Sequence, residues 1–132
     1  MELKVVVIVD EDVKEMARLE HAMQLSGFSI ACFKFTNLNE AVNFIFVQPD
    51  PIDYLLVDVD TVLPEEEWLL KTLASFGESP NMVTVAYSKN REKDVVALKK
   101  RLATHMVVTL PTDSYKYIGL VGHILVFHEL EG

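Results

Sequence analysis

Two apolar segments of the chain end in acidic residues. Val5–Val9 is a run of valine and isoleucine that leads directly into three consecutive acids at 10–12, and the segment from Tyr54 leads into Asp58 and Asp60. Continuous apolar runs of this length are typical of strands buried on both faces of a parallel sheet. If the two strands are neighbours, at least four carboxylates crowd one edge of the sheet. Their repulsion favours a divalent cation or a bound proton at that edge.

Length and composition indicate one domain over residues 1–132. The chain is long enough for a single core, and half of its residues are hydrophobic. The net charge of −8 opposes direct nucleic-acid binding, which depends on Lys and Arg contacts to phosphate. No apolar stretch is long enough for a bilayer and no leader precedes Val5, so we expect a cytoplasmic protein. The lone Cys32 is expected to be a buried small hydrophobe.

Strand and helix patterns alternate five times along the chain. The expected strands are Val5–Val9, Phe28–Phe35, Tyr54–Asp58, Met82–Tyr87 and Met106–Leu110. The expected helices cover residues 13–26, 38–45, 65–76, 95–102 and 114–130. This alternation predicts an α/β fold with a parallel sheet and helices on both faces. Five strands favour the order 2-1-3-4-5 of a flavodoxin-like three-layer sandwich, which places the first and third strands side by side.

Two of the helices carry more specific expectations. The third is predicted to bury Trp68, Leu69, Leu73 and Phe76 and to end at Gly77. The last is apolar around most of its circumference, which favours a homodimer interface, with the fifth strand beside it, over a helix tucked under neighbouring loops. Its apolar residues are Ile118, Leu120, Val121, Ile124, Leu125, Val126, Phe127 and Leu130.

The arrangement of acids resembles the receiver domain of bacterial response regulators over nearly the whole chain. An acid pair follows the first strand, an acid ends the third, and Pro111 follows the fifth. The resemblance implies that Asp10 and Glu11 hold Mg²⁺ together with Asp58. It also implies that Asp58 accepts a phosphoryl group from a histidine kinase or phosphotransfer protein. Asp53, five residues before Asp58, supports this register.

The physical chemistry of phosphoryl transfer agrees with such a site. A carboxylate attacks a phosphate poorly unless a cation screens the repulsion between the two anions. Mg²⁺ keeps several waters, so two or three carboxylates suffice to bind it. Capping of the first helix explains Asp12 but not the second acidic cluster. The resemblance implies no enzymatic activity beyond autophosphorylation from a kinase or a small phosphodonor.

Several positions depart from the family pattern and indicate an atypical or degenerate receiver. Leu110 stands where the family has a lysine that pairs with the phosphoryl group, and leucine offers no charge-assisted hydrogen bond. Its apolar side chain is expected to leave the acids less compensated, which favours a cation site. Ser88 is the candidate switch hydroxyl, with Tyr87 and Ala86 as other alignments, and Val107 replaces an aromatic residue.

Alternative interpretations remain open at this stage. Pro64 is spaced for an acceptor at Asp60 rather than Asp58. The chain also fits a pseudo-receiver, an interaction module that works without phosphorylation, and it could be the N-terminal fragment of a larger regulator. The residues from Asp58 to Val62 match the DxDx(T/V) motif of haloacid-dehalogenase-type phosphatases, with Asp58 as nucleophile and Asp60 as general acid/base. That motif normally ends the first strand of a larger domain and needs later partners that this sequence lacks.

Overall fold

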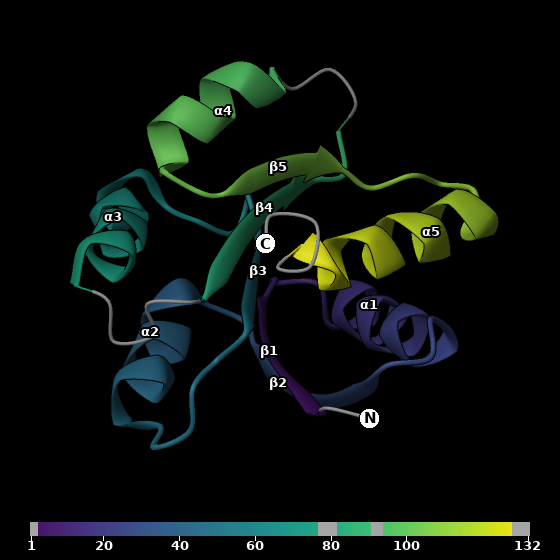
Figure 1. Cartoon of the computed structure of the whole chain (residues 1–132). Coiled ribbons are helices and arrows are strands. Elements are labelled where there is room, and N and C mark those ends of the chain that lie inside the picture. The colour runs from purple at the N-terminus through teal and green to yellow at the C-terminus, as the bar shows by residue number, and fades with distance from the viewer. Residues whose placement is uncertain (1–2, 77–81, 91–93, 128–132) are drawn as a thin grey trace.

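The computed structural model describes residues 3–76, 82–90 and 94–127, which form a three-layer α/β sandwich (Figure 1). The strands are β1 (Leu3–Val9), β2 (Ser29–Phe35), β3 (Tyr54–Asp58), β4 (Val83–Ser88) and β5 (Met106–Thr109). The helices are α1 (Val13–Leu25), α2 (Leu38–Val47), α3 (Glu67–Phe76), α4 (Val95–Leu102) and α5 (Ser114–Leu125), with a 3₁₀ turn η1 (Pro64–Glu66) before α3. The strands of this part of the chain pair in parallel in the order β2-β1-β3-β4-β5, as predicted.

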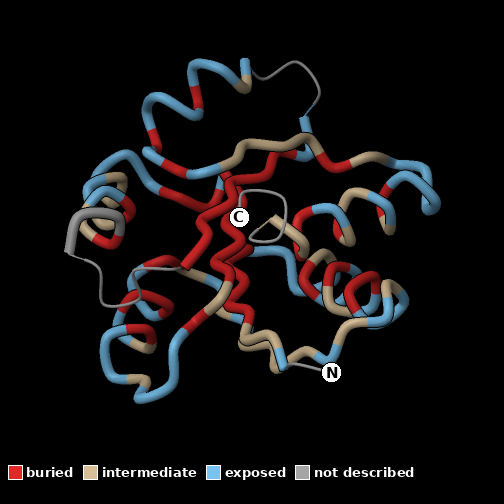
Figure 2. Tube along the Cα trace, in the orientation of Figure 1, coloured by how far each residue is buried: buried red, intermediate tan, exposed pale blue. Residues whose placement is uncertain are grey.

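The sheet separates two apolar cores. Alternate residues of β1 point to opposite faces, so Val6 and Ile8 lie in one core while Val7 and Val9 lie in the other. Helices α1 and α5 cover the first face, and α2, α3 and α4 cover the second (Figure 1). The central strands form the most continuously buried part of the chain (Figure 2). The apolar runs in the sequence therefore correspond to strands enclosed on both sides.

The start and end of α1 follow from local chemistry. The Asp12 carboxylate accepts hydrogen bonds from the backbone amides of Lys14 and Glu15, which confirms its predicted role as the N-cap. After the last turn, Gly27 adopts a φ of +87°, a left-handed conformation that glycine tolerates without strain. These two features hold α1 directly behind the acidic end of β1.

The predicted buried side of α3 is partly wrong. Trp68 is 61% exposed, whereas Leu70 and Leu73 are buried. Leu70 and Leu73 are three residues apart and share a helical face, while Trp68 lies two residues from Leu70 and points away from it. The sequence pattern supported either face. The side chain of Phe76 and the predicted end at Gly77 lie outside the described part of the chain.

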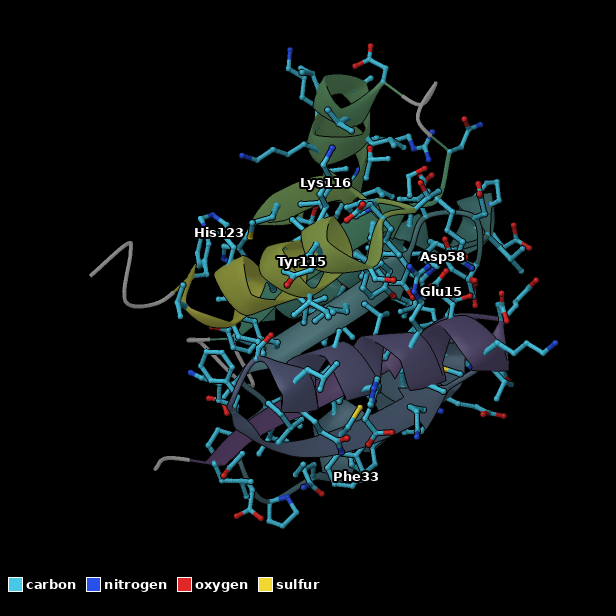
Figure 3. All side chains as sticks on the ribbon, turned by 90° about the vertical axis from the view of Figure 1, so that its right-hand side faces the viewer. Glu15, Phe33, Asp58, Tyr115, Lys116 and His123 are labelled. Atoms are coloured by element: carbon cyan, nitrogen blue, oxygen red, sulfur yellow. The ribbon has the colours of Figure 1, made fainter. Side chains whose placement is uncertain are left out.

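Helix α5 is less apolar on its outer side than predicted. It ends at Leu125, and the predicted extension to Leu130 reaches beyond the described residues. Its exposed positions are Ser114, Tyr115, Lys116, Gly119 and His123, three of which are labelled along it in Figure 3. Val121, Ile124 and Leu125 are buried in the core shared with α1 and the sheet, and Ile118, Leu120 and Phe127 are partly buried against it. The expected homodimer interface stays a prediction. Within the described ranges, no helix combines the length and the apolar character needed to cross a membrane.

The partly buried position of Cys32 in β2 predicts an unreactive thiol. Burial, followed by the charge of Glu20, raises the pKa of Cys32 to about 12 from an ordinary value of 9.0. The thiolate fraction at pH 8 should therefore be roughly a thousandfold lower in the folded protein. We expect iodoacetamide to modify Cys32 much more slowly in native protein than in urea-unfolded protein, as followed by intact mass. Equal rates in the two states would contradict this assignment.

Candidate functional site

The structure brings Asp10 and Asp58 to the same edge of the sheet. Val9 of β1 pairs with Val57 of β3, so the next residue of each strand emerges at the carboxyl end beside the other. Asp10 is 0% exposed and Asp58 is 5% exposed. Figure 3 shows Asp58 at this end of the molecule, near Glu15 in the first turn of α1. Two buried carboxylates therefore lie where open parallel sheets bind ligands.

Both oxygens of Asp10 have hydrogen-bond donors. Oδ2 accepts from the Tyr87 hydroxyl at 2.6 Å. Oδ1 accepts from the Asp12 backbone amide at 2.8 Å and from Lys89 Nζ at 3.1 Å. Burial and this bond to Asp10 raise the pKa of Tyr87, so its hydroxyl keeps the proton that it donates. Asp10 is thus a fully hydrogen-bonded carboxylate and belongs to the permanent framework of the site.

Only one of the two carboxylate oxygens of Asp58 has a hydrogen-bond donor. Its Oδ2 accepts a hydrogen bond from Thr61 Oγ1 at 2.9 Å, and Thr61 Oγ1 in turn accepts from the backbone amide of Glu11 at 3.0 Å. Its buried Oδ1 has no hydrogen-bond partner. Burial raises the pKa of Asp58, and Asp10 adds to this, while Thr61, Lys89 and the nearby backbone of Asp60 oppose it. A buried oxygen without a partner is costly, so Oδ1 marks the place for a ligand.

Lys89 provides the positive charge of the site. Its Nζ lies 3.1 Å from Asp10 Oδ1 and 3.8 Å from Asp58 Oδ2, and 4.0 Å from Asp12 Oδ2. Burial tends to lower the pKa of Lys89, but the hydrogen bond to Asp10 and the surrounding acids raise it overall, so the ammonium stays charged. The expectation that Leu110 leaves the acids less compensated is therefore wrong, because Lys89 enters from β4.

The other predicted positions play structural roles at this edge. Leu110 is 5% exposed and packs in the core that contains Tyr117 of α5. Ser88 is fully buried, and its hydroxyl bonds with the backbone carbonyl and amide of Asn90. Val107 is half-buried against the other core. At the end of β4, the hydroxyl that reaches an acid of the site is that of Tyr87, one residue before the candidate Ser88.

The remaining acids are not buried with Asp10 and Asp58. Glu11 and Asp60 are exposed, and Asp12 is the exposed cap of α1. Asp53 accepts a hydrogen bond from the Val5 backbone amide at 2.8 Å, at the opposite end of the sheet from the site. Of the two candidate acceptors in the Asp58–Asp60 segment, only Asp58 is buried.

The carboxylate oxygens of the site are of the type that binds a hard cation, but the described side chains do not form a complete metal-binding group. Carboxylate oxygens are the ligands that Mg²⁺ prefers, and Asp10 and Asp58 bring them to this edge of the sheet. Across the described ranges, no three His, Cys, Asp or Glu side chains come together as a metal-binding group. Lys89 also contacts both Asp10 and Asp58. A divalent cation would therefore have to share these carboxylates with the ammonium of Lys89.

Sequence reasoning did not identify Lys89 and Thr61 as residues of this site, and it named Tyr87 only as another alignment for the switch hydroxyl. Tyr87, Lys89 and Thr61 make the contacts that neutralise or orient the two acids. One signal was available for Lys89: it directly follows the fourth strand, which the predicted order places beside the third. For Tyr87 the signal was its place at the end of the fourth strand, where the family alignment expects a hydroxyl. Thr61 offered no comparable signal, because a threonine in a loop is common without any functional role.

The bond between Tyr87 and Asp10 should be important for stability. In Tyr87→Phe, Asp10 Oδ2 loses its donor while remaining buried, so we expect the free energy of unfolding to fall by about 1–3 kcal/mol. Urea denaturation monitored by circular dichroism would measure the change. Tyr115→Phe removes a hydroxyl from a side chain that is 91% exposed and serves as the matched control. Equal stabilities of the two variants would contradict the assigned bond.

Comparison with known proteins finds likeness in the fold and not in the sequence. No family model and no curated protein sequence matches the chain. A response regulator of red-light signalling in R. palustris has a TM-score of 0.78 at 10% identity, over 94% of this chain and 92% of its own. A CheY-like receiver domain protein from Methanospirillum hungatei has a TM-score of 0.70 at 16% identity, over 99% and 100%.

A third solved structure is the Mn²⁺-bound form of the response regulator Rcp1, with a TM-score of 0.72 at 15% identity, over 94% of this chain and 93% of its own. In each case the match covers nearly the whole of both chains, and sequence identity is too low to carry residue roles across. The topology, the layers and these matches agree with one another. The chain has the fold of a response-regulator receiver domain.

Proposed function

We propose that this chain is a receiver domain that accepts a phosphoryl group on Asp58. The observation that carries the proposal is the buried Oδ1 of Asp58, a carboxylate oxygen without a partner at the carboxyl end of a central strand. The neighbouring acid Asp10, by contrast, has a donor on each of its two oxygens. An oxygen that is held in place but unpaired is available to form a bond.

The arrangement around Asp58 favours one direction of attack. Thr61 holds Oδ2, so Oδ1 is the nucleophile. In the proposed step Oδ1 forms a bond to the phosphorus of a phosphohistidine or an acyl phosphate. The bond from phosphorus to the donor nitrogen or oxygen breaks, and the leaving group keeps that electron pair and takes a proton from solvent if it needs one. The product is an aspartyl phosphate, and no oxidant or reductant is involved.

A divalent cation fits this proposal. Asp10, Glu11 and Asp58 are the residues that would hold Mg²⁺, and one structural neighbour is described as a Mn²⁺-bound response regulator. The ion would supply positive charge that screens the repulsion between carboxylate and phosphate. Glu11, exposed at the rim, is the acid of the three that is free to turn toward such an ion without losing a buried contact.

The proposed partners and setting follow from the same fold. We infer that a histidine kinase or phosphotransfer protein of a cytoplasmic two-component system supplies the phosphoryl group, since the structural neighbours are response regulators. We also infer that residues 1–132 act as one domain. A phosphatase of the haloacid-dehalogenase type would need Asp60 beside the nucleophile, and Asp60 is exposed while Asp58 is buried.

A second candidate is a receiver-like module that works without phosphorylation. The observation that favours it is the ion pair of Lys89 with Asp10, which already supplies a counter-charge to the buried acids. In that case the pocket is a structural ion-pair network, and Asp58 contributes only to folding. The two candidates differ in whether a covalent adduct forms on Asp58.

Intact mass spectrometry with a small acyl phosphate and Mg²⁺ separates these candidates. We expect the unmodified protein to gain one phosphoryl group, Asp58→Asn to gain none, and Asp60→Asn to behave like the unmodified protein. The Asp60 variant is a matched control because it makes the same change two residues away at an exposed position. An adduct that persists in Asp58→Asn would move the acceptor elsewhere. No adduct on the unmodified protein would favour the phosphorylation-independent module.

Removal of divalent cations should slow the same reaction. We expect a chelator to reduce the rate of adduct formation by at least about tenfold, which corresponds to about 1.4 kcal/mol of lost transition-state stabilisation. Restoring Mg²⁺ should restore the rate, and Glu11→Gln should raise the Mg²⁺ concentration needed for half of it. An unchanged rate in the chelator would show that the protein's own charges suffice.

A further inference from the structure

Lys89 lies close enough to Asp58 to contact a group bound to this carboxylate. It directly follows Ser88, the last residue of β4, and β4 is the strand next to β3. Its Nζ lies 3.8 Å from Asp58 Oδ2, and about a third of its side chain is exposed. Its ammonium is a compact charge on a flexible four-carbon stem. It can therefore change partners within the pocket without movement of the backbone.

The neighbouring strand offers no substitute for this charge. Leu110, at the end of β5, is buried in the apolar core under α5. Among the salt bridges described for Asp10 and Asp58, each one involves Lys89. If phosphorylation adds negative charge here, the positive charge available to meet it comes from the end of β4.

We propose that Lys89 is the positioning residue that pairs with the phosphoryl group on Asp58, in place of a lysine at position 110. This inference rests on the proposed function. A phosphoryl group adds about 1.5–2 negative charges where the carboxylate had one, so it attracts the ammonium more strongly than the resting carboxylate does. Lys89 then moves from Asp10 Oδ1 toward the phosphoryl oxygens.

Asp10 tolerates the loss of this contact. Its Oδ1 keeps the backbone amide of Asp12 at 2.8 Å, and its Oδ2 keeps the hydroxyl of Tyr87 at 2.6 Å. Both oxygens of Asp10 therefore remain hydrogen-bonded when the ammonium leaves. Movement of Lys89 from Asp10 to the phosphoryl group therefore leaves no oxygen of Asp10 without a donor. The movement is short, because Nζ already lies 3.8 Å from Asp58 Oδ2.

The test measures formation and lifetime of the adduct in variants of the full chain. Lys89→Met removes the charge while keeping most of the stem, and Lys89→Arg keeps the charge. Lys100→Met removes a charge from an exposed position on α4 and is the matched control. With a small acyl phosphate and Mg²⁺, we expect the rate constant for Lys89→Met to fall at least about tenfold. The donor concentration for half-maximal rate should change much less, and Lys89→Arg should recover part of the loss.

A second variant moves the charge instead of removing it. We expect Leu110→Lys to restore the rate in the Lys89→Met background, because an ammonium at the end of β5 would replace the one lost from β4. Urea unfolding checks that this variant is folded, since position 110 is buried. If it does not fold, partial recovery in Lys89→Arg decides the question.

The outcomes separate this inference from the proposed function. A normal adduct on the unmodified protein with equal rates in Lys89→Met and Lys100→Met would overturn the role of Lys89 and leave Asp58 as the acceptor. No adduct on the unmodified protein would overturn the proposed function, and the role of Lys89 with it. A loss confined to Lys89→Met, with recovery in Lys89→Arg, would support both.

Discussion

Two carboxylates buried side by side at the ends of β1 and β3 set the main constraint on this protein. Asp10 and Asp58 are almost inaccessible to solvent, and a buried charge that lacks partners costs several kcal/mol. The surrounding structure reduces that cost with donors from two other segments. The end of β4 contributes Tyr87 and Lys89, and the turn after β3 contributes Thr61. The acids thereby connect the ends of β1, β3 and β4 through their side chains.

The two acids receive unequal numbers of hydrogen-bond donors. Asp10 receives three donors, including a charged one, whereas Asp58 keeps one oxygen unpaired. An acid that served only stability would gain from a second donor, because a buried unpaired oxygen is costly. Asp58 is therefore held less favourably than its neighbour by the same pocket. Functional sites commonly retain such local costs, which the packing of the apolar strands around them can offset.

The fold was predictable from the sequence because its signal is periodic and local. Uninterrupted apolar runs marked the central strands, and alternation with helical patterns gave the sheet order that the structure shows. The orientation of single residues was harder. The third helix carries apolar residues on more than one side, so Trp68 was assigned to the core although it is exposed. The same holds for α5, whose outer positions Tyr115, Lys116 and His123 are exposed although the apolar residues of the sequence suggest a helix apolar on most sides.

Only the site residues that directly follow or end an apolar strand could be predicted from the sequence. Asp10 and Asp58 each end an apolar strand, so their meeting follows from the sheet order. Lys89 is 79 residues from Asp10 in the sequence, and the choice of its ammonium over any other depends on side-chain reach. Tyr87 belongs to a strand that is buried at all six positions, so no alternation shows which face it points to. Contacts of this kind become visible only when the chain is folded.

The order of the strands places Lys89 close to Asp58. Adjacent strands lie about 4.8 Å apart, so a lysine after β5 would reach Asp58 across β4, whereas one after β4 starts from the neighbouring strand. With the charge supplied by Lys89, position 110 is free to be apolar, and Leu110 packs with Tyr117 beneath α5. On the proposed function, the phosphoryl group would then act directly on the end of β4. Tyr87 of β4 and Tyr117 of α5 lie in the same core, so the packing of these side chains offers a route from the end of β4 to α5.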